Sequence, residues 1–288
     1  MTDSIPKDAA IKRKQRMLRG SVFLTLSPIT ALILGIFISF LINDLIPTDS
    51  FAVYSLFNIM NSILVTVVPF RLPGAISRYL AVAKGRNSKS EIDDLIKSST
   101  LMTLVLAPVS GLVALITTPL IFDWLIDYEF LDVVLLAIGV MVINISAFSM
   151  NTMKGLQKFS EVGIAQFIAN ILGQATVIIL IIYGFGIHAL LSKWIVVGVL
   201  TAVFLTLAFR RIWSLQGKTY PLRPLLKFAF PGIIAFLVAF FFQEFLSRFI
   251  FLSFSSYELG LYAFAMRMYI FVNSFRKDFP PQSLCLPS

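Results

Sequence analysis

The stretch LDVVLLAIGVMVINISAFSMNT, residues 131–152, decides the fold of this chain. Apart from Asp132 near its start it carries no charge. As a helix rising about 1.5 Å per residue it is long enough to cross a hydrocarbon layer of about 30 Å. Because a helix satisfies its own backbone hydrogen bonds in lipid, this stretch predicts a membrane-spanning helix rather than a strand.

Seven further apolar segments of similar length accompany this one. The chain has a mean hydropathy of +0.87, and 14% of its residues are charged. We therefore expect an all-α, polytopic helical membrane protein with about eight transmembrane helices. The eight predicted spans are 21–43, 51–72, 98–119, 131–152, 163–183, 187–209, 228–252 and 258–275.

The distribution of Lys and Arg predicts the orientation. Of the 24 such residues, all but Lys193, Arg248 and Arg267 lie in the N-terminal arm, in or at the edge of the even-numbered gaps, or in the tail. Lys and Arg are retained on the cytoplasmic side of membranes, so the N-terminus and the even-numbered gaps are predicted to be cytoplasmic. This pattern, together with contact with anionic lipid headgroups, accounts for the net charge of +9. We expect a multi-pass protein of the cell membrane whose partner is the bilayer and not nucleic acid.

Several kinds of chemistry are excluded by composition. The single Cys285 cannot form a disulfide within the chain, and one histidine, His188, cannot form a His cluster around a metal. At a predicted external helix start, His188 is expected to be solvated or interfacial. No Walker loop is present, and the spans hold no clustered carboxylate pair or metal-ligand spacing. We therefore expect no cofactor, no metal and no enzymatic activity.

A weak internal repeat suggests two lobes. Residues 49–57 (DSFAVYSLF) resemble residues 257–265 (YELGLYAFA), six predicted helices later and in the same membrane orientation. Such a parallel repeat is typical of transporters built from two similar lobes. The predicted organisation is a first six-helix lobe over 1–210, a cytoplasmic linker over 211–227, the start of a second lobe over 228–275, and an atypical tail over 276–288.

Two local features leave alternatives open. Residues 89–97 (KSEIDDLIK) are either a short amphipathic helix lying on the membrane or an extension of the third span. In the tail, two adjacent prolines at 280 and 281 cannot continue a helix, and nothing after them could span a membrane. We therefore expect the chain to be a fragment, or a reading frame that has shifted near its end, which leaves its activity open.

Charged residues inside the spans are the candidate site residues. Glu244 and Arg248 lie four apart and can pair, either as a cation or proton site facing a cavity or as a static ion pair. Arg71 ends the second span and Arg267 lies within the eighth. Both could bind a phosphate group in a central cavity, although Arg71 is also placed to reach lipid headgroups.

A polar stripe runs along the fifth span. Gln166, Asn170 and Gln174 follow one another at four-residue spacing, so they share one face of the helix. Such a stripe either lines a hydrophilic cavity or joins neighbouring helices by hydrogen bonds. The spacing does not decide between these two interpretations.

Several stretches resemble a known family. They are Leu18-Arg19-Gly20-Ser21 after the basic arm, residues 76–81 (ISRYLA), residues 155–159 (GLQKF), residues 225–231 (LLKFAFP) and residues 258–262 (ELGLY). Their order and spacing are similar to the polysaccharide (O-antigen type) flippases of the multidrug/oligosaccharidyl-lipid/polysaccharide exporter superfamily. The resemblance covers nearly the whole chain to about Met268.

The resemblance implies a fold and a function. It implies two six-helix lobes around a central cavity, which move lipid-linked sugars across the membrane by alternating access, driven by an ion gradient or the membrane potential. It also implies cationic cavity residues that hold the pyrophosphate of the substrate. Two alternatives stay open: a cation-coupled multidrug antiporter of the same superfamily, with Glu244 as the coupling carboxylate, and a membrane-embedded glycan-assembly enzyme or factor.

Overall fold

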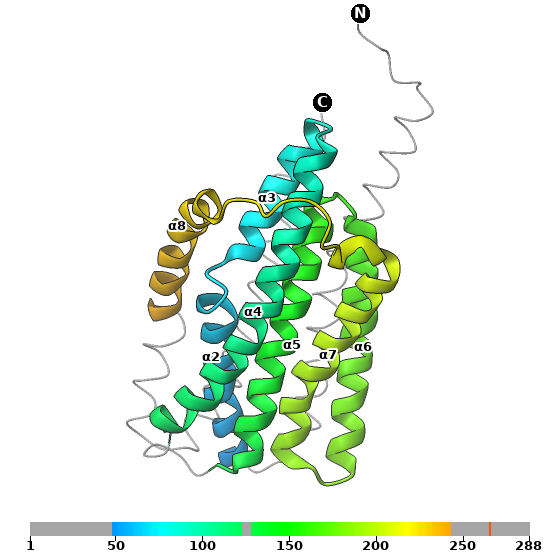
Figure 1. Ribbon diagram of the computed structural model, residues 1–288. Coiled ribbons are helices and arrows are strands. Elements are labelled where there is room, and N and C mark those ends of the chain that lie inside the picture. The colour runs from blue at the N-terminus through cyan, green and yellow to red at the C-terminus, as the bar shows by residue number, and fades with distance from the viewer. Residues whose placement is uncertain (1–47, 123–127, 243–264, 266–288) are drawn as a thin grey trace, which may run out of the picture.

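The computed structural model describes residues 48–122, 128–242 and 265 (Figure 1). The described residues form helices and contain no strand, which confirms the predicted all-α fold. In chain order the helices are α2 (Thr48–Val67), α3 (Leu72–Gly85), α4 (Lys89–Phe122), α5 (Phe130–Gly155), α6 (Phe159–Ile182), α7 (Gly186–Ala208), the short 3₁₀ helix η1 (Arg210–Trp213) and α8 (Leu222–Phe240).

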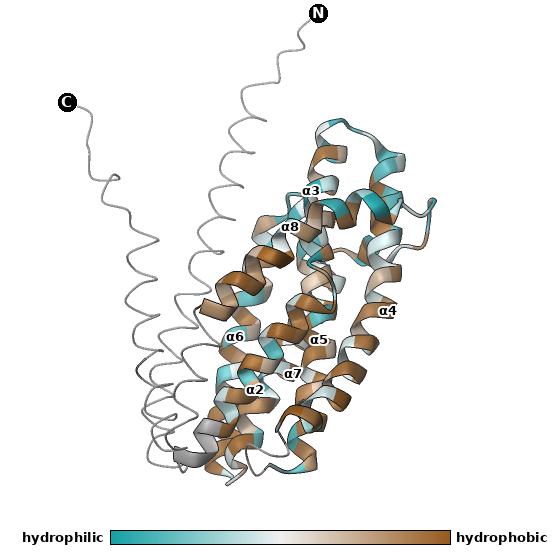
Figure 2. Cartoon of the chain, turned by 90° about the vertical axis from the view of Figure 1, so that its left-hand side faces the viewer, coloured by the Kyte–Doolittle hydropathy of each residue, from teal (hydrophilic) through white to brown (hydrophobic). Residues whose placement is uncertain are grey.

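The described helices are those of a multi-pass membrane protein. Five of them are long and apolar enough to cross a membrane, and the bent pair of α2 and α3 makes a sixth if it is one span. Apolar residues run along the length of the bundle (Figure 2). The predicted spans 21–43 and 258–275 lie outside the described residues except for Ala265, as does almost all of the second repeat copy, so the count of eight stays a prediction.

The second predicted span differs from its expected limits. A helix was expected over 51–72, followed by a polar gap over 73–97. Instead α2 ends at Val67, and α3 resumes at Leu72 with a bend of 42° between the two helices. Pro69 lies in the break, where its ring and missing N–H disfavour a continuous helix, whereas Pro73 falls in the first turn of α3, where proline is tolerated. The gap shrinks to residues 86–88.

Residues 89–97 are the first turns of α4. The helix runs without interruption from Lys89 to Phe122, so the extension of the third span is confirmed and a separate helix on the membrane surface is wrong. Leu95 and Ile96 are buried together with Leu80 and Ala83 of α3. This contact explains the continuous helix, because α3 buries the apolar side of the segment. In Figure 1 α3 and α4 rise together at one end of the bundle.

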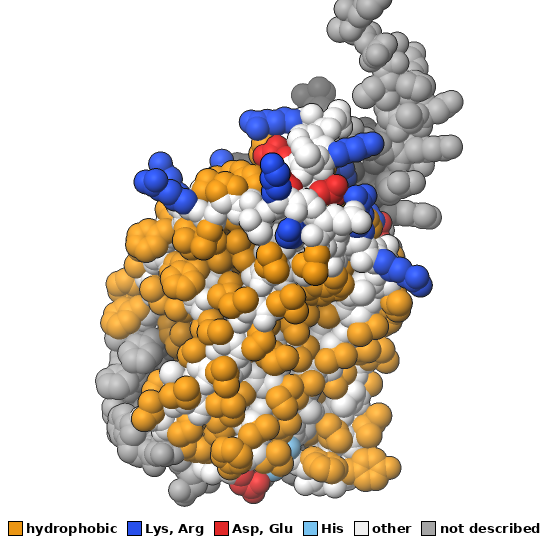
Figure 3. All heavy atoms as spheres, viewed as in Figure 1, with side chains coloured by type: hydrophobic (Ala, Val, Ile, Leu, Met, Phe, Trp, Pro, Cys, Tyr) orange, Lys and Arg blue, Asp and Glu red, His pale blue; other side chains and the backbone are white. Residues whose placement is uncertain are grey.

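Charge gathers at that same end. Figure 3 shows Lys and Arg side chains, with a few acidic ones among them, above an apolar flank, whereas the opposite end shows acidic side chains and the histidine. We call the end with the turn between α3 and α4 the basic end. The separation agrees with the alternation seen in the sequence, while the side of the membrane that each end faces stays a prediction.

The centre of the bundle is α5, which packs against α3, α4 and α7. Small residues bring the backbones close together where helices cross. A Cβ atom at Gly155 would lie 2.7 Å from the Ser77 carbonyl oxygen of α3, and one at Gly198 of α7 would lie 3.1 Å from the Val142 carbonyl carbon of α5. The first crossing fixes the position of α3 relative to α5, and the second fixes that of α7.

The connection between α7 and α8, residues 209–221, is attached to the first turns of α4. Arg211 Nη2 lies 3.1 Å from Asp93 Oδ2, and Lys97 Nζ donates a hydrogen bond of 2.8 Å to the Gly217 carbonyl. The connection therefore has a defined path that leads into α8. That helix begins at Leu222, before the predicted start at 228.

Candidate functional site between α3 and α8

Arg71 occupies the break between α2 and α3. Its Nη1 donates a hydrogen bond of 2.8 Å to the backbone carbonyl of Gly232 on α8. Gly232 follows Lys227 by about 7.5 Å along the helix axis, at 1.5 Å per residue, so the guanidinium lies beside the apolar part of α8. The sequence placed Arg71 at the end of the second span; α2 ends four residues before it, at Val67, and α3 begins directly after it, so that placement stays a prediction.

Basic and aromatic side chains join α3 to the first turns of α8. Arg78 Cζ lies 4.3 Å from the centroid of the Phe228 ring, within range of a cation–π interaction. The Tyr79 hydroxyl donates a hydrogen bond of 3.4 Å to the Pro224 carbonyl, and its ring contacts the rings of Tyr220 and Phe228. Burial raises the pKa of Tyr220, with a further contribution from Glu91.

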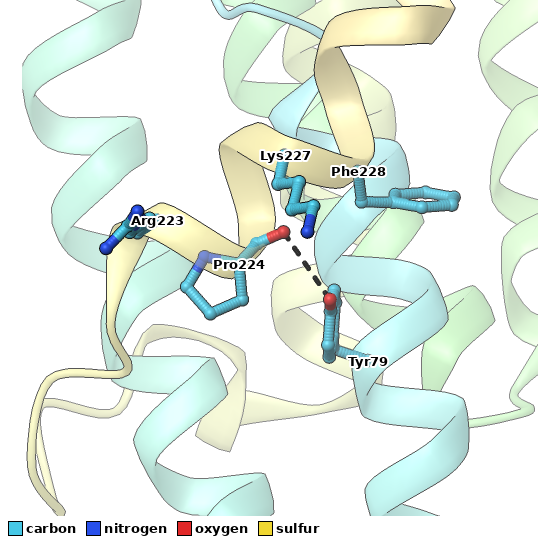
Figure 4. Close-up of a pocket in the computed structure, with 5 residues that line it drawn as sticks. All are labelled: Tyr79, Arg223, Pro224, Lys227 and Phe228. Atoms are coloured by element: carbon cyan, nitrogen blue, oxygen red, sulfur yellow. Dashed lines mark hydrogen bonds between the residues drawn. The ribbon is translucent and has the colours of Figure 1, made fainter.

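A depression of about 590 Å³ opens between these helices (Figure 4). The Lys227 side chain points towards Pro224 and Tyr79, while Arg223 points away from Tyr79. Apart from Pro224, the residues that line it carry a positive charge or an aromatic ring, and none carries a carboxylate: Tyr79, Arg223, Pro224, Lys227 and Phe228. Such a site favours an anion.

An apolar depression of about 910 Å³ continues from the first along α8 and shares its two basic residues. Its lining is Phe70, Leu222, Arg223, Leu226, Lys227, Ala229, Phe230, Pro231 and Ile233. We call the two depressions, together with Arg71 and Arg78 at their edge, the α3–α8 cleft. The cleft combines a basic, aromatic entrance with an apolar trough, which is the arrangement that an amphiphile with an anionic head requires.

The polar stripe predicted on the fifth span is not brought to this cleft. Gln166, Asn170 and Gln174 lie on α6, which packs against α7 and α5, and Gln174 is buried there. In Figure 1 α6 and α8 stand on opposite sides of the bundle. Glu244, Arg248 and Arg267 lie outside the described residues.

Sequence reasoning missed most of the cleft. Arg78, Arg223 and Lys227 were assigned to cytoplasmic gaps, and Tyr79 was not singled out. A signal was nevertheless present, because these residues lie in or beside two stretches that carry the family resemblance, 76–81 and 225–231. What the sequence did not show is that the two stretches meet.

A second polar cluster lies at the end opposite the basic end. His188 Nε2 is 3.2 Å from Asp132 Oδ1 and 3.4 Å from Glu129 Oε2. Asp132 is 2% exposed, and its Oδ2 accepts a hydrogen bond from the Glu129 backbone N–H. His188 is thus partly buried against two carboxylates rather than freely solvated. In the described part of the chain, no group of three or more His, Cys, Asp or Glu side chains could hold a metal ion.

Comparison with known proteins identifies the family. A sequence model described as "Polysaccharide biosynthesis protein" matches residues 80–276, more than half of the 288 residues. The chain belongs to this family. In this polysaccharide biosynthesis protein, the matched range begins within α3, directly after Tyr79, and includes all of α8. No curated protein and no solved structure matches the chain.

Proposed function

We propose that this polysaccharide biosynthesis protein is a transporter and not an enzyme. Its substrate is a lipid-linked oligosaccharide or polysaccharide precursor, which it carries across the cytoplasmic membrane by alternating access. The observation that carries the proposal is the α3–α8 cleft, where a basic, aromatic entrance leads into an apolar trough on one helix. A lipid-linked sugar has the matching parts, a pyrophosphate group and a long hydrocarbon chain.

Each part of the cleft has a role in this proposal. Lys227, Arg223 and Arg78 bind the pyrophosphate, because charge-assisted hydrogen bonds to phosphate are stronger than those to neutral acceptors. Phe230 and Ile233 of the trough contact the hydrocarbon chain beneath it. Because the lining carries no carboxylate, the positive field is not cancelled within the cleft.

The direction of transport depends on which side of the membrane the basic end faces. If this end is cytoplasmic, the entrance of the cleft opens at the inner leaflet, where the anionic head of the substrate would enter. A coupling cation, a proton or the membrane potential would then drive the return to the loading state. Glu244 and Arg248 stay the candidates for that coupling.

The test is binding and translocation by the full chain in lipid nanodiscs and proteoliposomes. We expect a sugar-linked polyprenyl pyrophosphate to bind and the corresponding polyprenol to bind at least tenfold more weakly. Replacing both Arg223 and Lys227 with Ala should weaken pyrophosphate binding at least a hundredfold, since each hydrogen bond to a charged group contributes roughly 1.5–3 kcal/mol and 1.4 kcal/mol is about tenfold in affinity. The control is Lys218→Ala, an exposed cation on the connection outside the cleft. Equal binding of both lipids to both variants would reject the proposal.

Other outcomes would favour the alternatives. Drug resistance on expression, without transport of lipid-linked sugar, would favour the cation-coupled antiporter. Polymerisation of glycan by the purified chain would favour an assembly enzyme or factor. Translocation of labelled lipid-linked sugar with neither of these activities supports the transporter.

A further inference from the structure

The break between α2 and α3 holds a backbone conformation that L-residues disfavour. Phe70 and Arg71 both have φ of 50°, in the left-handed region. Local hydrogen bonds hold them there: Phe70 N–H donates to Val67, Arg71 N–H to Thr66 and Leu72 N–H to Pro69. Strained non-glycine residues of this kind persist where the surroundings hold them in place, and they gather at switches and ligand sites.

The Arg71 side chain connects this break to α8 by one hydrogen bond. It lies across Gly232, where a Cβ atom would be 3.4 Å from Arg71 Cδ, and its Nη1 donates to the Gly232 carbonyl. A carbonyl is a neutral acceptor, and within the described residues Arg71 has no ion pair. A guanidinium has five N–H donors, so most of its capacity is unused by this hydrogen bond.

Arg71 also borders the apolar trough. Its neighbour Phe70 is one wall of that depression, and Ala229 and Ile233, which flank Gly232, belong to the opposite wall. The exposed Arg71 side chain lies at the edge of the depression that Lys227 also lines, where a phosphate group of the proposed substrate would enter. Phosphate oxygens form charge-assisted, bidentate hydrogen bonds with arginine, so they compete effectively with a backbone carbonyl.

We propose that Arg71 is a latch between the α2–α3 break and α8. When the cleft is empty, its guanidinium ties the break to Gly232. A phosphate group in the cleft draws the guanidinium away from that carbonyl, which frees α8 from the break and lets the bend between α2 and α3 change. The release of α8 by a phosphate group rests on the proposed function, whereas the hydrogen bond between Arg71 and Gly232 is a feature of the protein without ligand.

The closing contact is tested without ligand. Spin labels at Val82 of α3 and Ile234 of α8, both exposed, report the distance between the helices in nanodiscs by pulsed EPR. With Cys285 replaced by Ser, Arg71→Ala should lengthen and broaden the distance distribution, and Arg71→Lys should restore most of it. Arg223→Ala removes a cation of the same cleft without removing the bond to Gly232, so it should leave the distribution unchanged. An unchanged distribution in folded Arg71→Ala protein would overturn the latch.

The release step is tested with inorganic pyrophosphate and with a polyprenyl pyrophosphate. Either ligand should shift the wild-type distribution towards that of Arg71→Ala and leave the variant itself unchanged. If the ligands bind, as measured by calorimetry, but the distribution stays as it was, the latch is wrong and the proposed function stands. If neither binds, the release step falls together with the proposed function. A shift with inorganic pyrophosphate but not with the polyprenyl pyrophosphate would show that the ligand that releases α8 is a free pyrophosphate and not the lipid.

Discussion

Replacement of Gly155 with Ala should displace α3 and with it one wall of the cleft. A Cβ atom at Gly155 would lie 2.6 Å from Leu80 Cβ and 2.7 Å from the Ser77 carbonyl oxygen. Neither contact can be relieved by rotating a flexible side-chain end, so α3 itself must move. Arg78 and Tyr79 lie between these two contacts in the sequence and would move with it.

The expected change in the free energy of unfolding is the balance of two opposing effects. Each contact is about 1 Å shorter than ordinary carbon contacts of roughly 3.5–4.0 Å, and overpacking of this kind costs about 1–3 kcal/mol. Alanine instead of glycine in a helix returns roughly 0.5–1 kcal/mol. We therefore expect Gly155→Ala to lower the free energy of unfolding by about 1–2 kcal/mol and to weaken pyrophosphate binding.

The assay is equilibrium unfolding in mixed micelles, with the free energy extrapolated linearly to zero denaturant. Gly74→Ala is the matched control. Gly74 lies on α3, the helix that Gly155 of α5 packs against, and a Cβ atom at Gly74 meets no atom within 4 Å. Gly173→Ala should fall between the two, since its closest contact is the Val197 Cγ2 methyl, at the end of a side chain. Equal stability of the Gly155 and Gly74 variants would refute the close crossing of α3 and α5.

Three other predictions concern the connection, the orientation and the undescribed span. Gly217→Ala should loosen the connection and speed its amide hydrogen exchange, because φ is +97° there and a Cβ atom would meet an α4 carboxylate oxygen at 2.6 Å. Unchanged exchange would argue against the attachment of the connection to α4. In a background without the native cysteine, a membrane-impermeant reagent applied from outside should label a cysteine at Tyr183 and spare one at Gln216, and the reverse would invert the predicted topology. For Glu244 and Arg248, single replacements should abolish transport at normal folded yield if the pair faces a wet cavity, whereas full transport by the apolar double variant would show a static pair.

Much of the fold was predictable because its signals are local. An apolar run of the length of 131–152 has to be helical in lipid wherever it packs, since its backbone has no other hydrogen-bonding partners there. The gathering of Lys and Arg at one end is likewise visible in the order of residues. Boundaries near proline were not predictable in the same way: Pro69 breaks a helix and Pro73 starts one, although both lie close to the same apolar run.

The candidate site depended on the tertiary structure. Arg71 was singled out as an intramembrane cation, but its partner Gly232 lies 161 residues later, and only the packing of α8 beside α3 brings the two together. Lys227 looks like an ordinary loop charge in the sequence and becomes a cleft residue because α8 begins before it. The polar stripe on α6 is real as a helix face, yet packing places it away from the cleft. Hydropathy is a property of each segment, and so the sequence determined which segments are helices. A binding site is a property of two surfaces, and small residues decided how they meet: Gly155 lets α3 approach α5, and Gly232 lets the Arg71 side chain lie against α8.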